Sequence, residues 1–200
     1  MNWSDKPTVI VASGPSLCDE DIAQVRCAMD HVHVIVINDN WRLLPMAEVL
    51  YAADIGWWWQ YHSYVRDHFA GESWACDERV LIATEGRAHI VPSIVGVGLP
   101  EDGKTIKVGA SSTAQAIQLA YLWGTKRIAL LGVDCQGTHW FGDHPPILKE
   151  PLPYRRWINE LSFMAPQLEA AGVTVINCSR ETVLTCFVRM PLATFLPSSM

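Results

Sequence analysis

The sequence predicts an α/β fold: a three-layer, mostly parallel, Rossmann-like sheet with helices on both faces. Strand-like and helix-like segments alternate along the chain, as they do in such folds. Most of the strand-like segments are apolar throughout, which is typical of strands buried on both faces of a parallel sheet. With 200 residues, 50% of them hydrophobic, the chain fits a single domain around one core. We therefore expect residues 1–200 to form one domain.

The first part of the chain predicts three buried strands and two helices. Residues 7–13 (PTVIVAS) form an apolar, β-branched run that ends at a glycine-proline turn, and a helix begins near Asp19. Further strands are predicted at residues 32–38 and 48–54. A helix then runs through three consecutive tryptophans to about His68.

The middle of the chain, residues 70–108, contains many Gly and Pro residues and predicts a loop-rich insertion with short edge strands. One of these short strands is expected in RVLIAT, residues 79–84. A helix follows at residues 112–124, where Gly124 suits the position just after a helix end. The remaining predicted elements are a buried strand at 127–134, an amphipathic helix at 154–171, a strand at 173–177 and a short helical tail at 181–187.

Charge and composition exclude several classes of protein. The formal charge of −6, from 15 Lys and Arg against 21 Asp and Glu, argues against a broad nucleic-acid-binding face. No apolar run approaches the ~20 residues that span a bilayer. The start, MNWSDKPTVI, does not read as a signal peptide, and none of the six cysteines forms a CxxC pair. We therefore expect a cytoplasmic protein with reduced thiols.

Polar or small residues follow almost every predicted strand. In parallel sheets, ligands bind beyond the carboxyl ends of the strands, near a switch in strand order. The residues that follow the predicted strands are therefore candidates for ligand binding. They are Ser13, Gly14, Pro15, Ser16, Asn38, Asp54, Gly132 and Asp134.

Two small-residue turns lead into helices, VASGPSL at residues 11–17 and KVGASSTAQ at residues 107–115. Exposed N–H groups at a helix start favour an anion, and glycine lets a phosphate approach the backbone. Each turn also has a plain structural interpretation, in which Ser16, Ser111 or Ser112 caps its helix. Neither turn contains GK[ST] or GxGxxG, which disfavours a P-loop nucleotide hydrolase or a dehydrogenase. Together the two turns favour phosphate binding by this domain.

The loop THWFGDHP, residues 138–145, carries His139, Asp143 and His144. His-x4-His with an aspartate offers metal ligands, but no second cluster has a metal-binding spacing, so we predict no metal site. A histidine acting as a general base is favoured, because imidazole titrates near neutral pH. The structural alternative is a histidine packed against Trp140 or Phe141.

The order of these motifs resembles a known group of enzymes. A strand with GPSL, a strand ending in Asn, a serine-rich helix start, a strand with GVD and a histidine loop are similar to Campylobacter-type bacterial sialyltransferases. The order also resembles the related fold of MptE-like 6-hydroxymethylpterin diphosphokinases, and a set of phage- or prophage-borne proteins. The resemblance spans about residues 8–145 and then VINCSRETVLTCF. A phage-borne protein would act in the host cytoplasm.

The resemblance implies roles for matching positions. Gly14, Pro15, Ser16 and Asn38 would contact a cytidine nucleotide, and Ser111 and Ser112 would contact the nucleotide and its phosphate. Gly132 and Asp134 match the glycine and aspartate after the central strand, and His139 or His144 matches the base that acts on the acceptor hydroxyl. The sequence departs from the family at Ser13, where the family usually has Asn, and at ASS in place of Ser-Gly. The chain is also shorter, and its histidine loop follows GVD more closely.

Three hypotheses follow. The first is a nucleotide- or nucleotide-sugar-dependent transferase in which His139 or His144 deprotonates an acceptor hydroxyl. In it, Asp134 or Asp143 orients the base or binds a divalent ion with the donor phosphates. The second is an MptE-like, ATP-dependent diphosphokinase that requires Mg²⁺. The third is a non-enzymatic phage accessory protein that binds a nucleotide or metabolite. The sequence names neither donor nor acceptor, and it is compatible with a homo-oligomer.

Overall fold

The computed structural model describes residues 1–148 and 153–197, and it contains an eight-stranded sheet in which every neighbouring pair is parallel. The order is β10-β9-β8-β1-β2-β3-β4-β5. The strands are β1 (Thr8–Val11), β2 (His33–Ile37), β3 (Val49–Tyr51), β4 (Glu72–Ala75), β5 (His89–Ile90), β8 (Arg127–Leu131), β9 (Thr174–Asn177) and β10 (Val188–Arg189). The mostly parallel α/β fold predicted from the sequence is thus confirmed.

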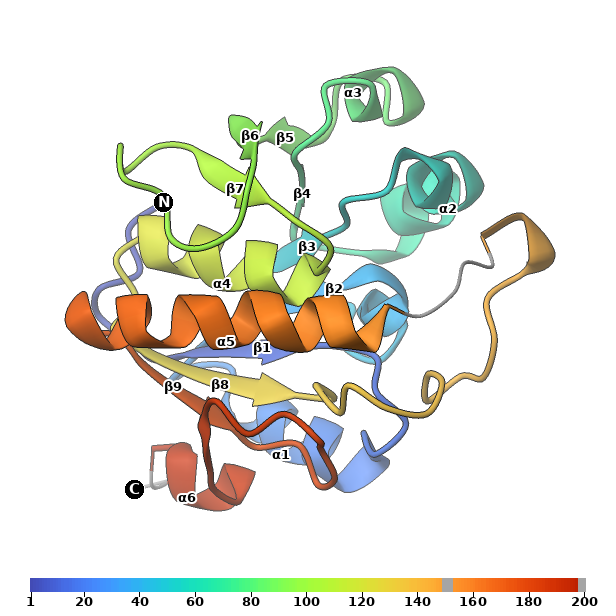
Figure 1. Cartoon of the computed structure of the whole chain (residues 1–200). Coiled ribbons are helices and arrows are strands. Elements are labelled where there is room, and N and C mark those ends of the chain that lie inside the picture. Colours follow the sequence, from blue (N-terminus) through green and yellow to red (C-terminus); the bar gives the residue numbers. More distant parts are fainter. Residues whose placement is uncertain (149–152, 198–200) are drawn as a thin grey trace.

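Helices cover both faces of this sheet (Figure 1). One face packs against α1 (Asp19–Ala28), α2 (Ile55–His68), α3 (Val80–Ala83) and α6 (Leu192–Phe195). The other face packs against α4 (Ser112–Leu122) and α5 (Tyr154–Ala170). Successive residues of β1 point to opposite faces, so Val9 and Val11 join the first core cluster and Ile10 joins the second. This double burial explains why the central strands are apolar throughout.

The strand order reverses next to β1. From β1 the chain builds the sheet outward through β2 to β5, and it later returns to place β8, β9 and β10 on the other side. Val11 at the end of β1 pairs with Leu131 at the end of β8. The segments that leave these two strands therefore diverge, and parallel sheets bind ligands at such a divergence.

Helix α4 begins and ends where the sequence predicts. Ser111 is its N-cap, and the Ser111 hydroxyl accepts the N–H of Ala114 at 3.2 Å. Gly124 follows the helix with a φ of 95°, a left-handed conformation that favours glycine. Most of α4 is buried, so this helix is apolar on nearly all sides and its start lies close to the sheet.

Two predicted elements are wrong. Residues 79–84 were predicted as a strand, but Val80–Ala83 form helix α3, because Asp77 accepts the N–H of Arg79 at 2.9 Å and starts a helical turn. Residues 181–187 were predicted as a helix but form no helix. Their polar groups instead bind the end of β8: Val183 donates its N–H to the carbonyl oxygen of Asp134 at 2.9 Å.

The loop-rich region 70–108 does contain the expected short strands. β4 and β5 extend the main sheet, and β6 (Ser93–Val95) and β7 (Ile106–Val108) form a separate two-stranded parallel sheet. Two short 3-10 helices, Asn38–Arg42 and Pro146–Leu148, complete the described elements. Among the described helices, none has the length and apolar character that crossing a membrane requires.

Candidate functional site

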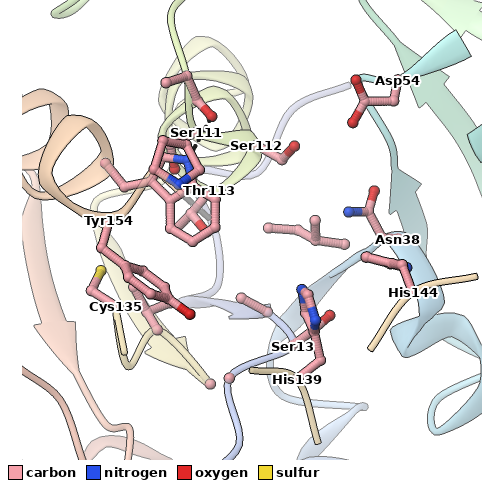
Figure 2. Close-up of a pocket in the computed structure, with 18 of the residues that line it drawn as sticks. Ser13, Asn38, Asp54, Ser111, Ser112, Thr113, Cys135, His139, His144 and Tyr154 are labelled. Atoms are coloured by element: carbon pink, nitrogen blue, oxygen red, sulfur yellow. Dashed lines mark hydrogen bonds between the residues drawn. The ribbon is translucent and has the colours of Figure 1, made fainter. Parts of the chain in front are cut away.

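A cavity of about 480 Å³ opens beyond the carboxyl ends of β1 and β8, where the strand order reverses. We call it the main cavity, and Figure 2 shows side chains from several elements converging on it. Most residues that the sequence nominated line it: Ser13, Gly14, Asn38, Asp54, Ser111, Ser112, Gly132, Asp134, His139 and His144. Pro15, Ser16 and Asp143 are not among the lining residues.

The turn after β1 binds the end of β8. The N–H of Gly14 donates to the carbonyl oxygen of Gly132 at 2.7 Å. A Cβ atom on Gly14 would lie 2.5 Å from that oxygen and 2.5 Å from Cγ of Asp134. This glycine is therefore required by the close approach of two chain segments, whereas the sequence suggested close approach of a phosphate.

Asp134 accepts two hydrogen bonds from Ser16, from the backbone N–H at 2.7 Å and from the hydroxyl at 2.8 Å. These bonds use both carboxylate oxygens and hold the start of the turn into α1. Burial raises the pKa of Asp134, although the Ser16 hydrogen bonds act in the opposite direction. Pro15 lies against Gly137, the residue directly before the histidine loop, since a Cβ on Gly137 would be 2.8 Å from the proline ring.

The start of α4 offers free donors to the main cavity. The N–H groups and hydroxyls of Ser112 and Thr113 have no hydrogen-bond partner among the described residues, and both residues line the cavity. They lie in the first turn of an 11-residue helix, where the helix dipole favours an anion. Ser111 is the capping residue, as the structural interpretation of this turn proposed. Thr113 was not predicted, although its place in the first turn is visible in the sequence.

Helix α5 holds both loops that border the main cavity. Trp157 donates its indole N–H to the carbonyl oxygen of Ala110 at 2.8 Å, and Tyr154 donates its hydroxyl to the carbonyl oxygen of Gly137. Glu160 accepts the N–H groups of Ala110 and Ser111 at 2.9 and 3.0 Å. The sequence analysis did not predict these contacts. The signal in the sequence is that Tyr154, Trp157 and Glu160 are spaced three residues apart, which places their polar side-chain groups on one face of a helix.

His139 and His144 meet inside the histidine loop, with ring centroids 4.5 Å apart. The Nδ1 atom of each ring is buried and lacks a hydrogen-bond partner among the described residues. Burial lowers the pKa of His139, and the neighbouring His144 adds to this effect. The ring of His139 also stacks on that of Phe141, with centroids 4.9 Å apart. The packing expected from the structural alternative is therefore present, and it leaves the Nδ1 atom of His139 without a partner among the described residues.

The histidine loop is fixed to the sheet through Asn40 and Ser13. Trp140 donates its backbone N–H to the carbonyl oxygen of Ser13 at 3.0 Å and its indole N–H to Oδ1 of Asn40 at 2.8 Å. Asn40 is fully buried, and its amide nitrogen donates to Val11, Ser13 and Ile37 at 2.8 to 3.1 Å. The sequence placed Asn40 after the second strand but gave no sign that it binds this loop.

Asn38 adds an acceptor to the same cavity. Its backbone φ of 51° lies in the left-handed region, and its buried Oδ1 has no partner among the described residues. Buried polar atoms are nearly always hydrogen-bonded, so an unpaired one that lines a cavity points to a ligand donor. Figure 2 shows Asn38 between Asp54 and His144 along one side of the cavity.

The carboxylates of the main cavity do not fit a divalent cation held by protein side chains alone. Of the described residues, Asp54 and Asp134 bring carboxylates to its lining, and Asp134 uses both oxygens for Ser16. Within the described ranges, no group of three or more His, Cys, Asp or Glu residues is placed to hold a metal ion. Asp143 does not line the cavity, so it does not bring a carboxylate to Asp134 there.

The fold of this chain is similar to the α/β fold of a bacterial sialyltransferase. One solved structure with a similar fold is that of the sialyltransferase CstII from Campylobacter jejuni, in complex with a substrate analogue, cytidine-5′-monophosphate. The TM-score is 0.60, with 16% sequence identity over 98% of this chain and 88% of that one. At this identity the likeness shows the fold alone. No protein-family model and no curated protein sequence matches the chain.

Proposed function

We propose that the protein is a glycosyltransferase-like enzyme that moves a group from a nucleotide-linked donor to an acceptor hydroxyl. One observation carries the proposal: the main cavity joins free N–H groups at the start of α4 to two half-buried histidines whose Nδ1 atoms are buried and have no partner among the described residues. The first feature suits a phosphate, and the second suits a proton acceptor. The solved neighbour is a complex with cytidine-5′-monophosphate, which supports the proposal of a nucleotide in this cavity.

The charges of the main cavity favour a donor with one phosphate. Among the described residues that line it, there is no Lys or Arg, and there are two carboxylates, Asp54 and Asp134. The phosphate must then be held by Ser112 and Thr113 at the positive end of α4. A helix end compensates about half an elementary charge. A single phosphodiester therefore fits this cavity better than a pyrophosphate, which brings a second negative charge.

In the proposed reaction, neutral His139 or His144 accepts the proton of the acceptor hydroxyl. The resulting oxygen attacks the donor carbon that carries the phosphate, and the bond between that carbon and the phosphate oxygen breaks. The departing nucleotide keeps the electron pair of the broken bond, and its new charge remains at the start of α4. The lowered pKa of His139 favours this role, because a protonated imidazole has no lone pair to accept the proton.

The test is a binding and turnover screen. Thermal stability is measured with CMP-, UDP-, GDP- and ADP-linked donors and with ATP, each with and without Mg²⁺, because a ligand that binds the folded form raises stability. A CMP-linked donor is expected to stabilise the protein most, and to be consumed when an acceptor is added. Mg²⁺-dependent consumption of ATP would instead favour a diphosphokinase, and tight binding without turnover would favour a non-enzymatic binding protein.

A further inference from the structure

A second cavity, of about 440 Å³, lies beside the main cavity, beyond the carboxyl ends of β3, β4 and β7. The two cavities share Asp54, Ala110 and Ser112 in their linings. Figure 2 shows Ser112 and Asp54 at the same end of the main cavity, with Asn38 and His144 following Asp54. A ligand in the second cavity would therefore extend past Asp54 toward the histidines and the start of α4.

The lining of the second cavity is acidic. It contains the carboxylates of Asp54, Asp77 and Glu78, and it contains no Lys, Arg or His among the described residues. Arg79 pairs with Asp77 at 2.5 Å, but the Arg79 side chain is largely exposed and does not line the cavity. A negatively charged ligand would meet like charges here, whereas hydroxyl and ammonium groups would find acceptors.

Gln115 supplies a hydrogen-bond donor to this cavity. The residue is only 3% exposed, and its Oε1 accepts hydrogen bonds from the hydroxyl of Tyr51 at 2.6 Å and from Sγ of Cys76 at 3.7 Å. These two donors fix which end of the amide is the oxygen. The amide nitrogen, Nε2, then donates to no group among the described residues. This N–H is accessible from the cavity that Gln115 lines, so it can donate to an acceptor oxygen of a ligand there.

We propose that the second cavity is the acceptor subsite, and that it selects uncharged or amino sugars over sugars that carry a carboxylate. Sugar hydroxyls would donate to the carboxylates of Asp77 and Glu78, and one sugar oxygen would accept the free N–H of Gln115. Ile94 and Val95 add an apolar wall for the C–H face of the ring. The role as acceptor subsite rests on the proposed transferase function, whereas sugar binding in this cavity does not.

The first test compares three sugars that share one ring: methyl glucoside, glucosamine and glucuronate. Binding to the full chain is followed by ligand-observed NMR titration. Methyl glucoside and glucosamine are expected to bind about tenfold or more tightly than glucuronate, because the uronate would be repelled by the acidic lining, above all by Glu78. Glu78→Gln should reduce this difference in affinity, because it removes one negative charge from the lining. Equal or tighter binding of glucuronate by the wild-type protein would overturn the proposal.

The second test blocks the cavity without disturbing the core. Val95 lines the second cavity and is 96% exposed, so Val95→Trp adds a ring at the surface. Binding of methyl glucoside should fall about tenfold or more, and the affinity for CMP should stay within about twofold. The matched control is Val188→Trp, on β10 and 67% exposed, which should bind both ligands like the wild type. Unchanged sugar binding in Val95→Trp would overturn the proposal.

The two proposals fail in different ways. If the wild-type protein binds no nucleotide, the proposed function is wrong, yet sugar binding that Val95→Trp abolishes still supports a sugar site in the second cavity. If nucleotide binding and donor consumption are normal but methyl glucoside binding is unaffected by Val95→Trp, the acceptor subsite lies elsewhere.

Discussion

The indole nitrogen of Trp140 donates a hydrogen bond of 2.8 Å to Oδ1 of Asn40, a residue 100 positions earlier in the chain. Because Asn40 also donates to the ends of β1 and β2, this one side chain fixes the histidine loop to the centre of the sheet. The position of His139 over the main cavity therefore depends on a residue that does not line that cavity.

Asn40→Ala is expected to lower the free energy of unfolding by about 2–4 kcal/mol, because several buried partners lose their hydrogen bonds. Urea unfolding followed by tryptophan fluorescence measures this change. The matched control is Asn38→Gly, which keeps the left-handed backbone and removes an oxygen without a protein partner among the described residues. The control should unfold like the wild type but bind CMP more weakly. An Asn40→Ala protein with unchanged stability would show that other contacts hold the loop.

Gly14→Ala is expected to destabilise the fold by about 2–4 kcal/mol, because the new methyl group would lie 2.5 Å from the backbone oxygen of Gly132. That oxygen cannot move without disturbing β8. Gly96→Ala is the control, since its Cβ would have no neighbour nearer than 3.6 Å, and it should change stability by less than about 0.5 kcal/mol. Similar unfolding curves for the two variants would contradict the close approach of these strands.

Replacing both His139 and His144 with Gln is expected to reduce transfer by about 10²-fold or more and to leave CMP affinity within about threefold. The comparison requires turnover and calorimetric titration on the same preparations. Gln keeps hydrogen-bonding capacity at both positions but does not accept a proton near neutral pH. Full transfer activity in the double variant would exclude a histidine base.

The lowered pKa of His139 sets the expected pH profile of transfer. Burial places this pKa below the ordinary value of 6.5, so the ring is neutral at pH 7 and above. The rate should be highest where the ring is neutral and should fall as the pH drops through the lowered pKa, because protonation removes the acceptor lone pair. A rate that rises on acidification from pH 7 to 5 would contradict this assignment.

Glu160→Gln should change how stability depends on pH. Burial raises the pKa of Glu160 above its ordinary value of 4.5. At a pH between 4.5 and the raised pKa, the carboxyl group keeps its proton in the folded state but has lost it in the unfolded state. Stability of the wild type therefore falls as the pH rises through this window. Gln cannot titrate, so the variant should not lose stability in this way. As the pH rises through the window, the urea midpoint of Glu160→Gln should therefore rise relative to that of the wild type. Parallel midpoint curves from pH 4 to 7 would contradict the raised pKa.

Much of the fold was predictable because the central strands are apolar on both sides, as in IVI of β2 and IALL of β8. Short strands were expected in region 70–108, but β4 was not placed at its own residues, because it lies near the edge of the sheet and only Ala75 of its four residues, ESWA, is buried. Helix α3 was mistaken for a strand because VLI favours either structure, and the deciding contact is the local bond from Arg79 to Asp77.

The candidate site was predictable to the extent that it follows strand ends. Ser13, Asn38 and Asp54 follow successive strands, and parallel strands end at the same edge, so these residues had to gather there. The contacts of Asn40 and Glu160 were not predictable, because they join residues 100 and 49 positions apart and depend on how helices and loops pack. The role of Gly14 also depends on packing, since its neighbour is β8.

The placement of β1 between β2 and β8 has a consequence for protein synthesis. β1 can pair with β2 once residue 37 has been made, but its other neighbour is complete only at residue 131. Until then, the growing chain presents the apolar segment Thr8–Val11 with one open edge, and such edges are templates for aggregation. Nascent chains that stall before β8 would be the form of this protein that most needs a chaperone.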